Sequence, residues 1–453
     1  MSFKRDFIWG AAAASYQIEG AWNEDGKGMS TWDHLTEKPG AVYQGHTGKV
    51  ACDHYHRYKE DIQLMKEMGL KSYRFSISWP RIFPDGTGEV NEAGLNFYSD
   101  LVDELIANGI MPFPTLFHWD FPYELHLKGG WLNRDSSDWF AEYTKVVVER
   151  LSDRVDHWFT LNEPQVFVGH GHATGEHAPG LKLQKRDIIR IIHNVLMAHG
   201  KSVKTIRKYS KMDSKVGMAP VCNVFIPTDE TPQSIKVAEE AMFSNKNGEH
   251  FSGWSNTWWL DPVYFGKYPT DGLDQAEQYL PSTWKDDLEI ISQPVDFLGN
   301  NHYSGSYIKA NKDGKPEHQK PEVGEALTGF NWSITPEGLY WGPKFLTQRY
   351  KSPIIITENG LSNRDWVSLD GKVHDPQRID FTHRYLREYK KAAADGVDII
   401  GYFHWSVMDN FEWAFGYRER FGLIHIDFNT QKRTIKDSGF WYKTVIESNG
   451  DNI

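Results

Sequence analysis

The chain has 453 residues, 40% of them hydrophobic and 25% charged, which is ordinary for a soluble globular protein with a large core. The 50 basic and 61 acidic residues give a net charge of −11 with no long run of either sign, so neither nucleic acid nor an anionic membrane is an expected partner. No stretch approaches the roughly 18 apolar residues that span a bilayer. Cys52 and Cys222 form neither a metal-ligand spacing nor a disulfide framework, which favours a reducing, cytoplasmic location.

Eight apolar runs are spread along the whole chain and predict buried strands. Several are continuous rather than alternating, as expected of strands that are covered on both faces. The first run superficially resembles the start of a secretory signal, but Asp6 interrupts it and Gln17 and Glu19 follow at once. The predicted strands are 7–12, 72–78, 111–117, 157–161, 216–221, 297–303, 354–357 and 399–406.

Helical patterns lie between these runs, with apolar residues at helical spacing within 95–106, 140–151, 192–206 and 381–393. Strand and helix alternating eight times predicts an α/β fold, a (β/α)8 TIM barrel in which residues 1–453 form a single domain. The structural competitor is a doubly wound open sheet. That fold usually has a Gly-rich phosphate turn after its first strand, which this chain lacks.

Two segments are longer than ordinary connections, 227–296 and 309–336. Insertions after the strands of a barrel build the rim of its cleft, and we expect these segments to do so. The aromatic share of 14%, with 18 tryptophans, has two explanations: stacking on sugar rings or ordinary packing of a large barrel. The first segment carries Trp254, Trp258, Trp259 and Trp284.

Two glutamates, Glu163 and Glu358, each end an apolar run in a polar context. The C-terminal tip of a strand is where a parallel barrel places its chemistry. Two carboxyl groups that face one substrate are the machinery of glycoside cleavage. Amides, a histidine and carboxylates suit sugar hydroxyls, and tryptophans offer a stacking floor. Such residues at or near the other strand tips are Gln17, Arg74, His118, Trp119, Asp120, Asn162, Asn301, Tyr303, Trp405, Glu412 and Trp413.

Glycoside cleavage needs two carboxyl groups in different protonation states, about 5 Å apart for double displacement. One must stay protonated to protonate the departing oxygen, and the other must stay ionised beside a cation such as Arg74. We assign the acid/base role to Glu163 and the nucleophile role to Glu358, although both stand next to an Asn. The alternative for either glutamate is a helix cap or a structural ion pair.

Histidine clusters suggest a metal site, but no recognised ligand set supports one. His54 and His56 are two residues apart in a predicted helix and point to different sides, with Asp53 as a helix N-cap. His170 and His172 follow Glu163 and are candidate loop ligands. We expect neither a metal nor another cofactor.

The motifs of this sequence resemble those of glycoside hydrolase family 1, the β-glucosidase family. Asn162-Glu163-Pro164 and Thr357-Glu358-Asn359-Gly360 are similar to its two active-site signatures. The resemblance runs from end to end of the chain. It includes the segments 7–20, 73–81, 118–120, 129–134 and 409–413.

The resemblance implies a retaining exo-β-glycosidase without a cofactor, with Glu163 as acid/base and Glu358 as nucleophile. Small β-glucosides and β-linked oligosaccharides are the implied partners, and some transglycosylation is expected. Asn301 and Tyr303 would help to orient Glu358, with Arg74 close by. The residues implied to bind the nonreducing sugar are Gln17, His118, Trp119, Asn162, Trp405, Glu412 and Trp413.

The chain departs from the family pattern on the leaving-group side, where aglycone preference is decided. Gln165 stands where the family often has Trp, and His302 where it often has Tyr. The segment around Trp332 lacks the acidic residue commonly found after this Trp. We therefore expect Gln165 and Trp332 on the aglycone side, and weaker stacking of a second glucose.

Three alternatives remain at the level of sequence. A 6-phospho-β-glycosidase needs cationic partners near O6, where Glu412 would repel a dianion. A noncatalytic sugar-binding barrel would have lost one of the two glutamates, and both are present. A metal-dependent sugar isomerase on the same fold lacks its ligand set here.

Overall fold

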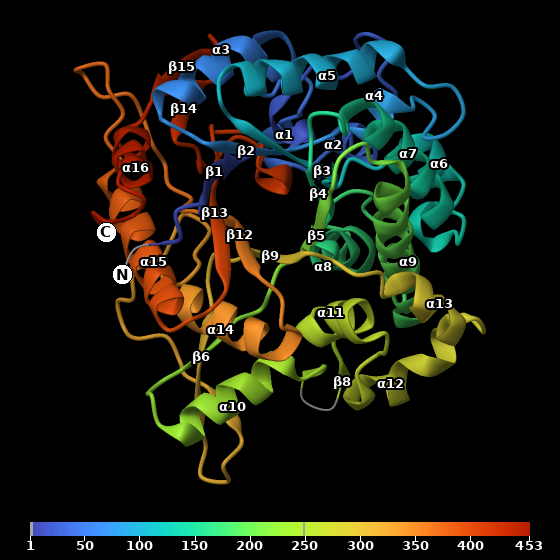
Figure 1. Ribbon diagram of the computed structural model, residues 1–453, viewed down its shortest axis with the longest axis vertical. Coiled ribbons are helices and arrows are strands. Elements are labelled where there is room, and N and C mark those ends of the chain that lie inside the picture. The colour runs from blue at the N-terminus through green and yellow to red at the C-terminus, as the bar shows by residue number, and fades with distance from the viewer. Residues whose placement is uncertain (1–2, 248–249) are drawn as a thin grey trace.

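The computed structural model describes residues 3–247 and 250–453, and its centre is a closed barrel of eight parallel strands (Figure 1). Each of the eight predicted strands is present, with bounds that shift by only a few residues. The strands are β1 (Ile8–Ala12), β2 (Ser72–Ser76), β3 (Met111–Phe117), β4 (His157–Asn162), β5 (Lys215–Ala219), β9 (Phe297–Asn301), β12 (Ile354–Asn359) and β13 (Ile399–Trp405). The TIM barrel prediction is confirmed.

The barrel closes because β1 pairs with β13 as well as with β2, all in parallel. Chain order is therefore also spatial order around the ring. Figure 1 shows the two chain ends close together beside this closure. A helix follows each strand, as the alternating pattern predicts. These helices are α3 (His54–Glu67), α5 (Glu92–Ala107), α7 (Ser136–Leu151), α9 (Lys185–Tyr209), α13 (Trp284–Ile291), α14 (Gly338–Tyr350), α15 (Pro376–Ala394) and α16 (Asp437–Glu447).

Shorter elements lie mostly in the connections. The helices are α1 (Ser15–Ile18), α2 (Thr31–Thr36), α4 (Trp79–Ile82), α6 (Tyr123–Leu127), α8 (Pro164–Val168), α10 (Pro232–Phe243), α11 (Asn256–Phe265) and α12 (Thr270–Ala276). The strands outside the barrel are β6 (Phe225–Pro227), β7 (Lys246–Asn247), β8 (His250–Phe251), β10 (Ser306–Ala310), β11 (Pro316–His318), β14 (Ile424–Asp427) and β15 (Lys432–Ile435).

The barrel interior is a packed aromatic plug rather than a pore. Phe113, Phe159, Phe297 and Phe403 belong to one buried cluster, which ends in Trp405 at the C-terminal tip of β13. A much larger buried cluster fills the space between strands and helices. Because the interior is filled, a binding site has to lie outside the plug, and in this fold it lies above the C-terminal ends of the strands.

Within the described residues, no helix is both long and apolar enough to cross a membrane.

Candidate active site

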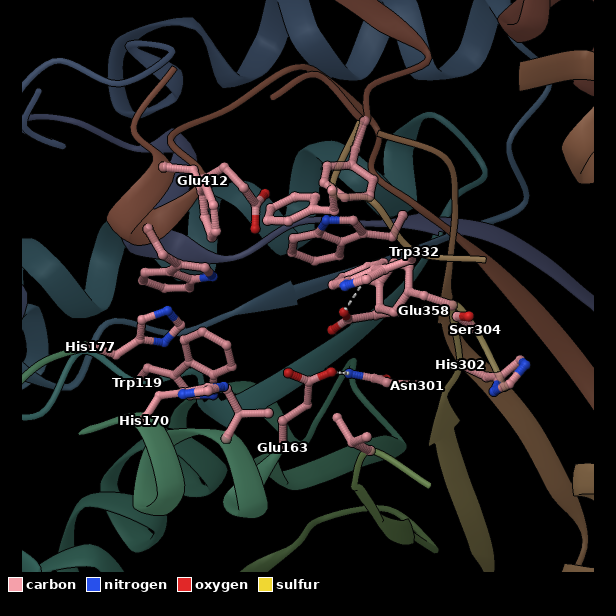
Figure 2. Close-up of a pocket in the computed structure, with 18 of the residues that line it drawn as sticks. Trp119, Glu163, His170, His177, Asn301, His302, Ser304, Trp332, Glu358 and Glu412 are labelled. Carbon is pink, nitrogen blue, oxygen red and sulfur yellow. Dashed lines mark hydrogen bonds between the residues drawn. The ribbon is translucent and has the colours of Figure 1, made fainter. Parts of the chain in front are cut away.

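A pocket of about 600 Å³ opens above the C-terminal ends of the strands and contains both glutamates. Figure 2 shows the carboxyl groups of Glu163 and Glu358 turned toward one another across it. The pocket is lined by residues from the connections after most of the strands. They are His118, Trp119, Glu163, Val166, His170, Glu176, His177, Val221, Cys222, Asn223, Trp254, Asn301, His302, Tyr303, Ser304, Phe330, Trp332, Glu358, Trp405, Glu412, Trp413, Phe415 and Phe421.

Glu163 stands between strand β4 and helix α8, in a sharp turn. Its φ is +43°, in the left-handed region that a residue with a side chain adopts only at a cost. The turn is fixed on one side by a backbone hydrogen bond to Ala219 of β5 and on the other by Pro164, the first residue of α8. The carboxyl group accepts its hydrogen bond from Asn301 Nδ2 at 2.9 Å instead of capping α8. Glu163 is therefore held toward the pocket, not used as a helix cap.

Glu358 lies inside strand β12 and is held by a cation and a phenol. Arg74 Nη1 donates to Oε1 at 2.8 Å, and Tyr303 Oη donates to Oε2 at 2.6 Å. Glycine follows Asn359 because a Cβ at Gly360 would lie 1.8 Å from the Trp405 carbonyl oxygen. The strand can thus pass closely by β13 and aim Glu358 into the pocket.

The two carboxyl groups differ in their surroundings and so in their acidity. Burial, reinforced by the charge of Glu358, raises the pKa of Glu163 to about 8. Burial also raises the pKa of Glu358, but Arg74 and then Tyr303 lower it. Glu358 therefore ionises first, and its charge keeps the proton on Glu163. The pair holds one acid and one carboxylate near neutral pH, as two coupled groups do.

Asn301 holds Glu163 and also lowers the pKa of Glu358, the residue that the sequence predicts it to orient. Its amide nitrogen donates to Glu163 Oε1 and to Asn162 Oδ1 at 3.0 Å, while its oxygen accepts from Thr357 Oγ1 at 2.6 Å. Thr357 thereby fixes which end of the amide faces the acid. Tyr303 contacts Glu358 as predicted.

The residues predicted to bind the sugar lie at the inner end of the pocket. Some form its wall, and others lie directly behind that wall. His118, Trp119, Trp405, Glu412 and Trp413 line the wall itself. In Figure 2, Trp119 and Glu412 lie on the side away from His302. Tryptophan rings around carboxylate and imidazole groups offer both stacking and hydrogen bonds to a sugar.

Behind this wall lie Gln17, Arg74 and Asn162, which are fully buried. Gln17 Nε2 donates to Phe411 O at 3.0 Å and lies 3.4 Å from Glu412 Oε2. Arg74 donates to Asn162 Oδ1 at 2.5 Å, so the Asn162 amide nitrogen faces His118 Nε2 at 3.0 Å. His118 Nε2 is then the acceptor, and burial keeps the His118 pKa well below its usual value.

Three residues of the pocket wall have left-handed backbone conformations. Trp119 and Trp413 have φ values of +83° and +50°, and both line the pocket together with Glu163 at +43°. Left-handed conformations of such large residues persist only when the surroundings enforce them, which is typical of functional sites.

Comparison with known proteins agrees with this geometry. The family model described as Glycosyl hydrolase family 1 matches residues 1–451. The chain belongs to this family. It is 48% identical over 452 residues, 99% of both chains, to a 1,4-beta-D-glucan glucohydrolase of Thermotoga neapolitana. It is 39% identical, over 100% of this chain and 98% of the other, to an aryl-phospho-beta-D-glucosidase of Bacillus subtilis.

A solved structure of a beta-glucosidase from Thermotoga maritima, in complex with glucoimidazole, has the same fold. Its TM-score is 0.90 at 45% identity, and the match covers 99% of each chain. The family 1 chain described here is therefore a glycoside hydrolase with a TIM barrel.

The outer part of the pocket of this family 1 chain differs from the sequence prediction at Gln165. The side chain of Gln165 is buried and donates to the Val221 carbonyl at 2.9 Å. Among the described residues, the neighbouring Val166 lines the pocket and Gln165 does not. Gln165 therefore lies behind the wall that Val166 forms, because its side chain turns back onto the connection after β5. Trp332 does line the pocket, on the opposite side from His170 and His177 in Figure 2.

The long segments contribute less to the rim than their length predicts. Trp254 and Trp332 line the pocket, but Trp258 and Trp259 are fully buried in the core. Sequence reasoning missed Glu176 and His177, which lie in the connection after β4, as well as Phe415 and Phe421 after β13. Nothing in their local sequence marks these residues. Only the path of each loop brings them to the wall.

Metal ligation has no support in the described part of the chain, where no group of three or more His, Cys, Asp or Glu side chains is arranged to hold an ion. His54 is buried against Asp61, whereas His56 is exposed and contacts Asp53 and Glu24. Asp53 does precede α3, but it accepts from His56 and Arg57 instead of capping the helix. Cys52 and Cys222 are buried and free.

Proposed function

We propose that this chain is a retaining exo-β-glucosidase that removes terminal nonreducing glucosyl residues through a covalent glycosyl-enzyme intermediate. The observation that carries the proposal is the asymmetry of the two carboxyl groups. Arg74 and Tyr303 stabilise the anion of Glu358, while burial and that anion keep Glu163 protonated. The beta-glucosidase name of the solved Thermotoga maritima relative supports the choice of substrate.

In the first step, Glu358 attacks the anomeric carbon while Glu163 gives its proton to the departing glycosidic oxygen. A covalent ester to Glu358 forms and the aglycone leaves. Neutralising Glu358 removes the charge that raises the Glu163 pKa, so Glu163 becomes the stronger acid and remains ionised. It then takes a proton from water, which attacks the same carbon and releases the sugar. An alcohol in place of water gives transglycosylation.

The sugar hydroxyls would meet the inner wall formed by His118, Trp119, Glu412 and Trp413, above the Trp405 ring. Glu412 offers acceptors suited to neutral hydroxyls. Because Glu412 suits free sugar hydroxyls in either configuration, we expect galactosides and fucosides as additional substrates. The aglycone would extend toward His170, Glu176 and Trp332 at the outer side.

The experiment that tests the proposal uses 2-deoxy-2-fluoro-β-glucosyl fluoride, which forms the ester quickly and hydrolyses it slowly. We expect a stoichiometric mass increase located on Glu358, and a trapped crystal structure with the two carboxyl groups about 5 Å apart. Attachment elsewhere, or no attachment together with a first-formed α-anomeric product, would contradict the retaining mechanism.

A 6-phospho-β-glycosidase is the second candidate, favoured by the similarity to the Bacillus subtilis enzyme. Among the described residues that line the pocket there are four glutamates and no lysine or arginine. A phosphate dianion would find no cationic side chain in this wall to pair with. We therefore expect 4-nitrophenyl β-glucoside to be hydrolysed far faster than its 6-phosphate. The opposite ratio would favour the phospho-glycosidase.

The remaining expectations belong to the same proposal. A noncatalytic barrel would bind but not cleave 4-nitrophenyl β-glucoside, and a metal-dependent isomerase would lose activity on exhaustive chelation, which we do not expect here. The absence of nucleic-acid and membrane partners and a cytoplasmic location stay predictions from composition. The single-domain organisation of residues 1–453 likewise stays a proposal.

A further inference from the structure

Glu419 is a buried carboxylate close to the pocket that the proposed mechanism does not use. Glu419 is 1% exposed and, within the described residues, lies behind the pocket wall instead of lining it. Its Oε2 accepts a hydrogen bond from Ser362 Oγ, and its Oε1 accepts one from Arg418 Nε at 2.7 Å. Burial of a charged group is costly, so these partners have to be held firmly.

Three connections meet at Glu419. Ser362 belongs to the connection after β12, and Glu419 itself to the connection after β13. These two are joined by a pair of backbone hydrogen bonds between Asn363 and Arg420, at 3.0 and 3.2 Å. The third is a tight hairpin, 327–333, whose Gly329 amide donates to the Ser362 carbonyl at 2.9 Å.

Gly329 packs directly against the side-chain pair. A Cβ added there would lie 2.5 Å from Glu419 Oε2 and 2.5 Å from Ser362 Oγ, a distance that no real Cβ tolerates. The hairpin therefore rests on the hydroxyl–carboxylate bond itself. Moving either group would move the base of the hairpin.

The hairpin carries two rings of the pocket wall. Phe330 and Trp332 stack at 4.8 Å with an angle of 16° between their planes, and Phe330 also contacts Phe415 and Phe421. Trp332 contacts Tyr303, the phenol that binds Glu358. Trp332 is 37% exposed, so one ring face remains open to the outer pocket.

We infer that Glu419 and Ser362 are positioning residues that set the aglycone specificity of this enzyme. They hold hairpin 327–333 so that Phe330 and Trp332 form a flat aromatic wall for large or aromatic aglycones. This inference rests on the proposed β-glucosidase function. It concerns only the outer pocket, so a substrate without a bulky aglycone does not depend on it.

Two substrates separate the outer pocket from the chemistry. β-Glucosyl fluoride has the smallest leaving group and does not reach the hairpin, whereas 2-naphthyl β-glucoside extends along it. We expect Ser362→Ala to raise the KM for the naphthyl substrate and lower its kcat/KM by up to about fivefold, with the fluoride almost unchanged. Gly329→Ala leaves both Ser362 and Glu419 unchanged. It should have the same selective effect, because the added Cβ displaces the hairpin.

The matched control is Ser438→Ala. Ser438 Oγ likewise donates to a buried carboxylate, Asp375 Oδ2, at 2.6 Å, but neither residue lines the pocket in the described parts of the chain. A general loss of stability would therefore appear in this variant too, and thermal melting would report it. We expect Ser438→Ala to leave the ratio of the two kcat/KM values unchanged.

Glu419 also lies close enough to Glu412 for its charge to act on the sugar end of the pocket. Ser362→Ala and Gly329→Ala keep that charge, so an equal loss on both substrates in these variants would overturn the inference. An unchanged ratio would overturn it as well. If the wild-type protein cleaves neither substrate, the β-glucosidase proposal itself fails, which is a separate outcome.

Discussion

The inner and outer halves of the pocket are built in different ways. Inside, Glu163 and Glu358 stand at the ends of β4 and β12, above the aromatic plug, with partners on other strands of the barrel, Asn301 on β9 and Arg74 on β2. Outside, Glu176, Trp254 and Trp332 stand on connections that are held by loop-to-loop contacts. The comparison indicates that the chemistry is fixed by the barrel, while aglycone selectivity is set by loops.

This division predicts a hierarchy of effects. A substitution at the inner end should change the chemical step for every substrate, because every substrate meets the same two carboxyl groups. A substitution at the outer side of the pocket should change only how particular aglycones bind.

The largest effect is expected for Glu358→Gly. Removing the nucleophile should lower kcat by about four orders of magnitude or more with any aryl glucoside. The space left by the side chain should let azide attack the anomeric carbon directly. Because this is a single displacement, the rescued product should be α-glucosyl azide, which NMR distinguishes from the β-anomer.

The matched variant is Glu163→Gly, in which Glu358 can still form the ester from an activated substrate. Azide should then attack the ester in a second displacement and give β-glucosyl azide. Identical anomers from the two variants, or an exchange of the two products, would show that the acid/base and nucleophile roles are wrongly assigned.

The next effect is expected for Glu163→Gln. 2,4-Dinitrophenol is a leaving group that departs without protonation. We therefore expect a burst of one equivalent of dinitrophenolate per enzyme, followed by turnover that is about 10²- to 10⁴-fold slower than in wild type. The amide cannot take a proton from the attacking water. Stopped-flow absorbance measures both phases, and a steady rate equal to wild type without a burst would contradict the role of Glu163.

Much of this inner half is predictable from the sequence because the strands are buried on both faces and end at polar residues. That pattern places Glu163 and Glu358 at the same end of a barrel, and Arg74 within another of its strands, β2. The contact of Asn301 with Glu163 is not predictable in this way. It depends on which end of the amide Thr357 fixes, a detail of side-chain geometry between β9 and β12.

The outer half of the pocket can hardly be predicted from the sequence, for a physical reason. Loop residues such as Glu176 and Phe415 have no periodicity that signals their direction, and their place follows from contacts with other loops. Gln165 illustrates the difficulty, since it lies only two residues after Glu163 yet turns away from the pocket to Val221. Sequence distance from a catalytic residue does not measure distance along the pocket wall.

A smaller inner effect is expected for Tyr303→Phe. The phenol stabilises the anion of Glu358, so its loss should raise the pKa of Glu358. The acid limb of the kcat/KM profile should therefore move to higher pH, by about one unit for one hydrogen bond to a charged group. The alkaline limb, which follows deprotonation of Glu163 with its pKa of about 8, should remain, with activity lost as pH rises through it.

An acid limb that stays in place or moves to lower pH would contradict this assignment of Tyr303. A decrease in kcat without any shift would mean that the phenol acts on the substrate instead of on Glu358. Tyr385→Phe is a suitable control, because its hydroxyl donates to the Tyr303 carbonyl at 2.9 Å and does not contact either carboxyl group in the described structure.

The smallest effect is expected at the outer wall, for Trp332→Ala. Loss of one stacking face is worth about 1 kcal/mol, so the KM for aryl glucosides should rise about fivefold while kcat stays near wild type. Gln165→Ala should change KM less, because the Gln165 side chain is buried against Val221 and lies behind the wall. Gln165→Ala could instead raise KM more than Trp332→Ala does, with both aryl glucosides and cellobiose. The aglycone would then have to bind along the β4 side of the pocket, and the aromatic hairpin would not be its main contact.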